Sequence, residues 1–504
     1  MLEEYIREYE GFNIALAREY YLHFSGQKDE FAIVPVYDRY SDLFTRDAIA
    51  SIKRELEETS EHFETERAAR RHLLAFASTH FLENSARQLA EEIGQYETRA
   101  TVRAAGREMT FQESEVAVRT ESDRDLRRAI YTSRLRVLEG ANDLRLERLT
   151  RLHDGARSLG YDSYTALYQQ LRHLDYARLA REVEDFLART EAVYVSRLDE
   201  ALRRYLGLRI EEAERPDALY FLHLAGYDEW FPADALLRVY RETMAGLGVD
   251  VERQQNIKID SADRPRKRPR AFCVGVSVPE EIKLVIRPMG GQSDYAAFFH
   301  EAGHAQHYGW TAAALRPEFK YTGDPALSET YAFLFNYLLL EGSWLAGMLG
   351  FGQNGGYTRS ATLAKLITAR RCAAKFLYER ELHSNADYGR ASGLYSELQS
   401  GATRFQTGEA EFLYDLDDAF YSADYLRAWA FEVMLREYLK TRFGQQWWTA
   451  RHAGNLLKEM WETGDRYTAD QMAAQVGVGT ISFDPLIDEF NHLLKPYSLS
   501  EKSR

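Results

Sequence analysis

Residues 299–307 read Phe-His-Glu-Ala-Gly-His-Ala-Gln-His. His300 and His304 are four residues apart, so on a helix both imidazoles project from one face and can reach one zinc ion. Glu301 lies about 100° further round the helix, where its carboxylate can act as a general base on a water molecule. Because so short a pattern also arises by chance, the residues around it decide its weight.

A third ligand is expected from a separate helix. Gly323-Asp324-Pro325 predicts a helix start, with Asp324 as the N-cap and Pro325 at the first helical position. Glu329 lies one turn into that helix, ahead of a very apolar run, and a carboxylate there needs a partner such as a metal ion. Two histidines and one glutamate leave the open position that a catalytic zinc requires. His307 is either a supporting hydrogen-bond donor, a substrate contact or a partly exposed surface histidine.

A pair of strands precedes the histidine-bearing helix. Apolar residues alternate over 272–278, Pro279-Glu280-Glu281 interrupts them, and a second apolar run covers 282–287. This pattern predicts a strand, a turn and a second strand. Residues 290–294 end the hairpin and offer an N-cap to a helix over 295–309. A substrate backbone is expected to pair with the strand at 283–287.

The rest of the chain has a helical texture. Apolar residues recur at three- and four-residue spacing, which is typical of amphipathic helices; the segments concerned are 1–25, 42–98, 122–158, 175–207, 359–385, 394–406 and 424–442. The composition changes near residue 251, where proline and arginine become frequent. We therefore expect a helical lobe over 1–250 that walls a cleft, and a catalytic region over 251–504.

The composition and charge of the chain argue against several classes of protein. The 504 residues carry a net charge of -14, with 45% apolar and 28% charged side chains, which is ordinary for a globular protein and opposite to the basic surplus of nucleic-acid binders. The basic run 264–270 is expected to be a solvated loop; its alternative roles are to bind a substrate carboxylate or to imitate a nucleic-acid patch. Two cysteines cannot form a disulfide framework, and the first residues lack a secretory pattern, so a cytoplasmic location is expected. The apolar stretch Tyr331–Phe351 contains Asn336 and Glu341 in its middle, which predicts a buried helix and a turn and no membrane span.

Residues 256–345 resemble the thimet oligopeptidase and oligoendopeptidase F family, and more distantly the angiotensin-converting enzymes. The matching elements are 267–272 ahead of the strand pair, the strand around Leu284, the run 300–307, and Thr322-Gly323 before Ser328-Glu329. The resemblance implies one zinc ion per chain, held by His300, His304 and Glu329, with Glu301 as general base. It also implies a mostly α, two-lobed zincin-type fold with a deep cleft and a small sheet beside the active-site helix.

A tyrosine-rich patch near the C-terminus extends the resemblance. In the family a helix here faces the zinc, and Tyr421 and Tyr425, one turn apart, can donate a hydrogen bond to the oxyanion. Their alternative role is core packing. The family's histidine upstream of the tyrosines is replaced by residues 415–418, Ala428 stands where the angiotensin-converting register has tyrosine, and Phe333 stands where one branch has a supporting aspartate. These departures concern oxyanion stabilisation and substrate preference and leave the zinc ligands untouched.

The sequence thus predicts a zinc metallopeptidase that hydrolyses short or unfolded peptides as an oligoendopeptidase, with a water activated by Glu301. Peptides are the expected partners, with neither nucleic acid nor membrane, and the oligomeric state stays open. Two alternatives remain: a zinc carboxypeptidase of similar helical fold, and an inactive peptide-binding protein on the same scaffold.

Overall fold

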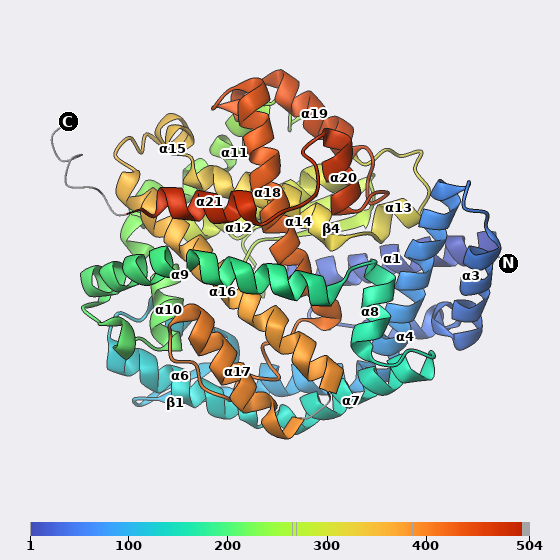
Figure 1. The fold of residues 1–504 in the computed structure, drawn as a ribbon, viewed down its shortest axis with the longest axis horizontal. Helices are drawn as coiled ribbons and strands as arrows, with labels where there is room; N and C mark the ends of the chain where they lie inside the picture. Colours follow the sequence, from blue (N-terminus) through green and yellow to red (C-terminus); the bar gives the residue numbers. More distant parts are fainter. Residues whose placement is uncertain (1, 265, 269, 386–387, 496–504) are drawn as a thin grey trace. The chain divides into compact units, whose positions relative to one another are not determined.

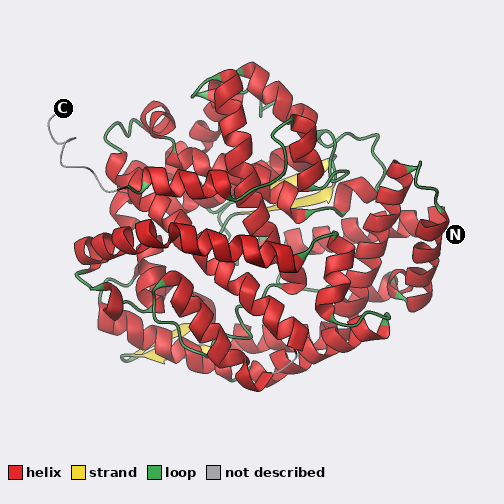
Figure 2. Ribbon diagram, in the orientation of Figure 1, coloured by secondary structure: helices red, strands yellow, loops and turns green. Residues whose placement is uncertain are grey.

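The protein is predominantly helical. The computed structural model describes residues 2–264, 266–268, 270–385 and 388–495, and Figure 2 shows helices throughout, with strands in only two places. The chain divides into two compact units, each built from three separate segments. Unit 1 contains residues 1–84, 226–354 and 427–482; unit 2 contains residues 85–225, 355–426 and 483–504. The mostly α fold class is confirmed.

The expected boundary at residue 250 does not separate the two units. The first 84 residues group with the histidine-bearing region because helix α1 (Leu2–Phe24) packs on the sheet that precedes it. Arg18 forms an ion pair with Glu281, and the Phe24 ring meets the Phe272 ring edge-on. These contacts join residues that lie more than two hundred positions apart, which local sequence patterns cannot reveal.

The helices of unit 1 come from all three of its segments, and several are labelled in Figure 1. Besides α1 they are α2 (Val34–Arg39), η1 (Ser41–Phe44), α3 (Arg46–Glu58), η4 (Ala233–Ala235), α11 (Leu236–Gly246), α12 (Gln292–Trp310), α13 (Glu318–Tyr321), α14 (Pro325–Asn336), η5 (Tyr337–Leu340), α15 (Gly342–Leu349), η7 (Trp447–Thr449), α19 (Arg451–Trp461) and α20 (Ala469–Val476). Helices α4 (Glu64–Arg99) and α18 (Tyr421–Phe443) and the turn η3 (Ala225–Trp230) each contain a boundary between the units.

Unit 2 is built from longer helices and one hairpin. Its helices are α5 (Phe111–Thr120), α6 (Arg124–Glu139), α7 (Asn142–Ser158), α8 (Tyr164–Arg172), α9 (Tyr176–Leu206), η2 (Ile210–Glu212), α10 (Arg215–Leu222), α16 (Gly355–Asn385), α17 (Tyr388–Thr403), η6 (Asp418–Phe420) and α21 (Asp484–Leu493). Leu149, Tyr378 and Tyr395 bring α7, α16 and α17 into one apolar cluster. The antiparallel pair β1 (Thr101–Ala104) and β2 (Arg107–Thr110) was not predicted; its signal is the turn at Ala105 and Gly106, both at positive φ.

A three-stranded sheet in unit 1 positions the histidine-bearing helix. The predicted strand pair is confirmed as β4 (Phe272–Ser277) and β5 (Glu281–Val285), which are antiparallel, and β3 (Ile257–Asp260) adds a parallel partner to β5. The order β3-β5-β4 makes β5 the central strand. The prediction that substrate pairs with residues 283–287 is therefore wrong, because both edges of β5 are already bonded; β4 is an edge strand.

The two faces of this sheet are covered by different helices. Lys283 points toward α1, where its ammonium lies 5.2 Å from the centre of the Tyr21 ring. The opposite face carries Ile282 and Leu284, both fully buried, and it packs on α12, where Gly309 meets Ile257. Unit 1 is thus layered as α1, sheet, α12 and α14.

The apolar stretch Tyr331–Phe351 forms α14, η5 and α15, with its large side chains buried, as predicted. Among the described residues, no single helix has the length and apolar composition to span a membrane. Only α14 with η5 and the following α15, bent by 75°, meet that test together, by length and composition alone.

Candidate metal centre

Helix α12 carries the histidine pair, packs through an apolar face and is held at its N-terminal end. Its buried face includes Phe298, Phe299 and Ala302, at the spacing that a packed helix requires. The expected side-chain N-cap is absent: Gly291, at φ 90°, occupies the N-cap, and the Asp294 carboxylate accepts hydrogen bonds from the amides of residues 289 and 290.

Helix α14 begins as predicted. The Asp324 carboxylate accepts the Ala326 amide at the N-cap, and Pro325 occupies the first helical position. The same carboxylate accepts two hydrogen bonds, each 2.9 Å, from the Arg427 guanidinium. Arg427 is 5% exposed, so this pair anchors the start of α14 inside the unit.

Helices α12 and α14 touch at Gly303. A Cβ atom at this position would lie 2.5 Å from the carbonyl oxygen of Tyr331 and 2.6 Å from Cα of Ala332. No larger residue fits without moving a backbone. The absence of a side chain at position 303 therefore brings the histidine face of α12 against the glutamate on α14.

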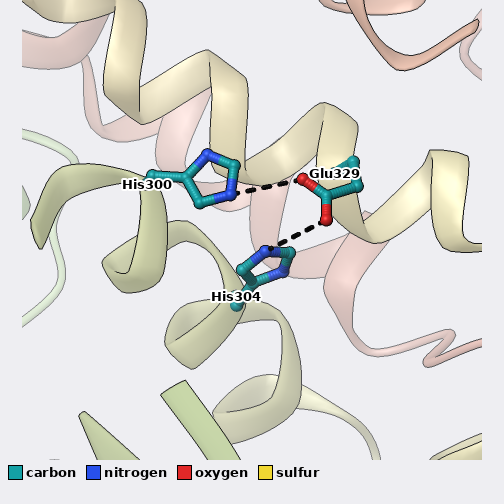
Figure 3. Close-up of side chains that lie close together, drawn as sticks. All are labelled: His300, His304 and Glu329. Carbon is teal, nitrogen blue, oxygen red and sulfur yellow. Dashed lines mark ion pairs between the residues drawn. The ribbon is translucent and has the colours of Figure 1, made fainter. Parts of the chain in front are cut away.

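The three predicted ligands converge at this crossing. Figure 3 shows both imidazoles turned toward the Glu329 carboxylate, with Nε2 of His300 3.3 Å from one oxygen and Nε2 of His304 3.8 Å from the other. One donor atom from each residue lies within 4.8 Å of the other two. Glu329 is 3% exposed, whereas the two histidines are half-buried. The structure thus joins residues that the sequence places on two separate helices.

The donor set fits a zinc ion. Ligand atoms held about 2.0–2.1 Å from one zinc ion in a tetrahedral arrangement lie about 3.3 Å from each other. The His300 nitrogen lies 3.3 Å from one Glu329 oxygen and the His304 nitrogen lies 3.8 Å from the other, both close to this value, and one atom from each residue lies within 4.8 Å of the other two. Two imidazole nitrogens and one carboxylate also form a known catalytic zinc set, which leaves a fourth position open.

Glu301 is held beside the edge of the sheet. Its Oε2 accepts the backbone amide of Cys273 on β4 at 2.9 Å. The bond fixes the carboxylate on the side of α12 that faces the edge strand. Burial raises the pKa of the Cys273 thiol, and the nearby Glu301 carboxylate adds to this effect. Both influences keep the thiol neutral.

The second histidine is hydrogen-bonded through Nδ1, while its Nε2 faces Glu329. Nδ1 of His304 lies 2.8 Å from Oγ of Ser328, the residue immediately before Glu329. Burial lowers the pKa of His304, and the Glu329 carboxylate partly opposes that shift. The neutral ring that results is the form that binds a metal.

His307 is fully buried, which excludes the interpretation as a surface histidine. Its Nδ1 lies 3.3 Å from Oγ of Ser328 and its Nε2 lies 3.3 Å from the Gly464 carbonyl oxygen. Burial lowers the pKa of His307 to about 4. His307 therefore lies behind the predicted ligands, where it contacts the Ser328 hydroxyl that also bonds His304.

His300 is supported by an aromatic ring. The ring centre of Phe333 lies 5.1 Å from that of His300, and Phe333 itself stacks on Tyr337 and Trp429. Phe333 occupies the position at which one branch of the family that the sequence resembles has a supporting aspartate. Apolar packing replaces the carboxylate there.

The role of two predicted residues is not tested by the geometry of unit 1. Tyr421 and Tyr425 lie in unit 2, on consecutive turns of α18 with ring centres 5.0 Å apart, so their role toward an oxyanion stays a prediction. Asp415, where the family has a nearby histidine, pairs with Arg371 and Lys375, and this pairing lowers its pKa to about 2.

The basic loop 264–270 is partly internal. The ammonium of Lys267, 3% exposed, binds the Asp260 carboxylate, and Arg264 binds the same group. Residues 265 and 269 lie outside the described residues. The interpretation as a solvated loop is therefore wrong for Lys267.

Sequence reasoning missed three supporting groups: the Ser328 hydroxyl, the Gly464 carbonyl and the Cys273 amide. Ser328 had a local signal, because a hydroxyl next to a ligand can support a neighbouring imidazole. The two backbone groups had none, since any residue type supplies them.

Comparison with known proteins gives a fold. No protein-family model matches the sequence, and no curated protein matches it. A protein of Bacillus anthracis str. Ames assigned as an oligoendopeptidase F is 14% identical, with a TM-score of 0.66 over 95% of this chain and 88% of that one. A structure of PZ peptidase A with an inhibitor is 15% identical, with a TM-score of 0.67 over 96% and 90%.

A protein from Chlamydophila abortus assigned as a peptidase is 11% identical, with a TM-score of 0.64 over 98% of this chain and 88% of that chain. These identities are too low to transfer an activity, but the likeness extends over nearly the whole chain. The chain has the helical fold of peptidases of the oligoendopeptidase type.

Proposed function

We propose that the protein is a zinc-dependent oligoendopeptidase that hydrolyses bonds inside short or unfolded peptides. The observation that carries the proposal is the convergence of His300, His304 and Glu329 within 4.8 Å, with Glu301 on the same helix. Each of the three comparison structures is described as a peptidase, which supports the same chemistry.

The proposed roles follow from donor chemistry. His300, His304 and Glu329 would hold one zinc ion, which when bound lowers the pKa of a water molecule and polarises a peptide carbonyl. Glu301 takes a proton from the attacking water and passes it to the leaving amine. The bond from the Cys273 amide holds one oxygen of Glu301 and leaves the other for the proton.

The edge strand β4 is the proposed site for the peptide backbone. The Cys273 amide points away from β5, since it bonds Glu301, so the Cys273 carbonyl and the main-chain groups of Gly275 face the edge of β4 that pairs with no strand among the described residues. An extended peptide can add there as a further strand, beside the general base. Tyr421 and Tyr425 remain the proposed oxyanion donors, and the deep cleft and a cytoplasmic location remain predictions.

The test uses internally quenched peptides of several lengths, with free and with amidated C-termini, and mass spectrometry to locate the cut. We expect internal cleavage of both forms, loss of activity with 1,10-phenanthroline and recovery on adding zinc. Glu301→Gln should bind zinc as the wild type does and lose roughly 10²–10⁴-fold in kcat. Glu459→Gln, an exposed change on α19, is the matched control and should leave kcat unchanged.

Cleavage restricted to free C-termini would replace the proposal with a carboxypeptidase. Binding of peptides without hydrolysis by either wild type or Glu301→Gln would replace it with the peptide-binding alternative.

A further inference from the structure

A chain of hydrogen bonds lies behind the metal centre, on the side away from Glu329. It runs from Nδ1 of His304 to Oγ of Ser328 (2.8 Å), from Oγ to Nδ1 of His307 (3.3 Å), and from Nε2 of His307 to the Gly464 carbonyl (3.3 Å). Ser328 is 7% exposed and His307 is fully buried. All four residues belong to unit 1.

The Gly464 carbonyl determines which atom donates in each of these hydrogen bonds. A carbonyl oxygen only accepts, so Nε2 of His307 must carry a hydrogen. Burial favours the neutral imidazole, whose Nδ1 is then an acceptor. Ser328 has one hydroxyl hydrogen, and it donates this hydrogen to that nitrogen at 3.3 Å in preference to the Tyr308 hydroxyl oxygen at 3.5 Å; its oxygen accepts the Nδ1 hydrogen of His304.

This pattern of hydrogen bonds determines the protonation of Nε2 of His304, the nitrogen proposed to bind the metal. With its hydrogen on Nδ1, His304 has a bare Nε2, and this nitrogen faces Glu329. We infer that Ser328 and His307 are positioning residues that fix the ring orientation and the tautomer of His304 for metal binding. The inference rests on the proposed function. Neither residue touches the reacting atoms.

The placement of Ser328 differs from that of an ordinary helical hydroxyl. A buried serine or threonine inside a helix commonly bonds the carbonyl four residues earlier. Thr330 on the same helix does so, with Oγ1 2.7 Å from the Ala326 carbonyl. The Ser328 hydroxyl instead faces two imidazoles and, at 3.5 Å, the Tyr308 hydroxyl. Ser328 and the adjacent Glu329 approach opposite edges of the His304 ring.

The test measures zinc affinity of the purified full chain by competition with a chromophoric chelator. We expect Ser328→Ala to bind zinc about 10–100-fold more weakly, the usual effect of removing a partner of a metal-bound histidine. Ser328→Thr keeps the hydroxyl and should stay within about threefold of wild type. Thr330→Val removes a buried hydroxyl that does not contact a histidine, and it should bind zinc normally.

A second variant and a second readout guard against misfolding. His307→Phe should weaken zinc binding by a smaller factor than Ser328→Ala, because Ser328 can still accept from His304. The visible spectrum of the Co²⁺-loaded protein should change in Ser328→Ala and keep its wild-type form in Ser328→Thr and Thr330→Val. Near-ultraviolet circular dichroism of each metal-free variant checks the fold.

Equal zinc affinity and equal Co²⁺ spectra in wild type, Ser328→Ala and His307→Phe would overturn the inference. So would equal losses in Ser328→Ala and Thr330→Val, because the effect would then be general destabilisation. A wild-type protein that binds no zinc would instead overturn the proposed function, and this outcome is distinct from the others.

Discussion

At the scale of single residues, the two imidazoles of the candidate metal centre are supported by different kinds of interaction. His304 is held by a hydrogen bond to Ser328, whereas His300 packs on the ring of Phe333. Phe333 is itself stacked on Tyr337 and Trp429 with interplanar angles of 11° and 26°. The His300 ring meets Phe333 at an angle of 59°, so this contact supports the ring by packing and not by a hydrogen bond. Aromatic packing of this kind is worth about 0.5–1.5 kcal/mol per pair beyond simple burial.

Phe333→Ala is predicted to harm both stability and metal binding. The lost side chain is almost fully buried, so the free energy of unfolding should fall by about 3–5 kcal/mol. The freed His300 ring should also weaken zinc binding. Urea unfolding of the metal-free protein and chelator competition measure the two effects. Phe335→Ala, a fully buried change on the same helix that contacts Trp461, should lower stability similarly and leave zinc affinity unchanged.

The sequence indicated the candidate ligands but not all of the groups that support them. His300, Glu301, His304 and Glu329 follow from spacing and from the resemblance, because chemistry demands those residue types. The Gly464 carbonyl that orients His307 could not be predicted, since a main-chain oxygen has no signature in the residue type. The orienting role of Phe333 was visible only as a departure from a pattern.

At the scale of elements, the contact between α12 and α14 determines the geometry of the centre. Gly303→Ala should lower the free energy of unfolding by about 1–3 kcal/mol, because the added methyl group meets the backbone of α14. Zinc affinity should fall as well. The measurements are urea unfolding and chelator competition.

The matched control is Gly401→Ala on α17, where an added Cβ meets nothing within 4 Å. It should stabilise the protein by about 0.5–1 kcal/mol, the usual gain in helix propensity. A Gly303→Ala protein as stable as wild type would show that the two helices separate easily.

A second prediction concerns α7 and α16, which a histidine pair joins. Nε2 of His153 lies 2.9 Å from Nδ1 of His383. Burial lowers the pKa of His153 to about 4 and lowers that of His383 still more. At pH values between about 4 and 6.5, His153 is therefore protonated in the unfolded chain but neutral in the folded protein. Stability should therefore fall as the pH drops from about 6.5 toward 4, by about 3 kcal/mol in total for this group.

His153→Gln should remove this contribution. The slope of unfolding free energy against pH between 5 and 6.5 should become smaller by up to about 1.4 kcal/mol per pH unit. Urea unfolding at several pH values measures the slope, and the exposed His62→Gln is the control. An unchanged slope in His153→Gln would contradict the prediction.

Some helices and strands could be predicted from the sequence, and others could not. Long helices such as α9 follow from their apolar spacing, and β4 and β5 follow from alternation and the intervening proline. The four-residue strands β1 and β3 are too short to give a clear alternation. The central position of β5 depends on β3, so missing β3 put the substrate at the wrong strand.

At the scale of the whole molecule, the chain crosses between its two units repeatedly. The three predicted ligands and the Ser328–His307 support lie entirely in unit 1. Zinc at about 100 times its Kd should stabilise the folded state by about 2.7 kcal/mol. Hydrogen exchange with and without zinc should show slower exchange in α12 and α14 and little change in α6 and α17. Equal slowing in both units would show that they unfold together.

The division into units could not be predicted from the sequence. A change of composition near residue 251 is real, but it marks the beginning of the sheet region, and residues 1–84 pack against that region from the far end of the chain. Composition reports local texture, and only contacts distant in sequence reveal which segments fold together.

The discontinuous make-up of unit 1 bears on biosynthesis. A nascent chain that has emerged only as far as residue 336 already exposes every ligand, yet it lacks the Arg427 guanidinium that anchors α14 and the Gly464 carbonyl that orients His307. The full set of supporting contacts around the centre can therefore form only after residue 464 has been synthesised. The proposed peptidase would thus acquire its supported metal centre only after residues from three separate segments of the chain have been synthesised.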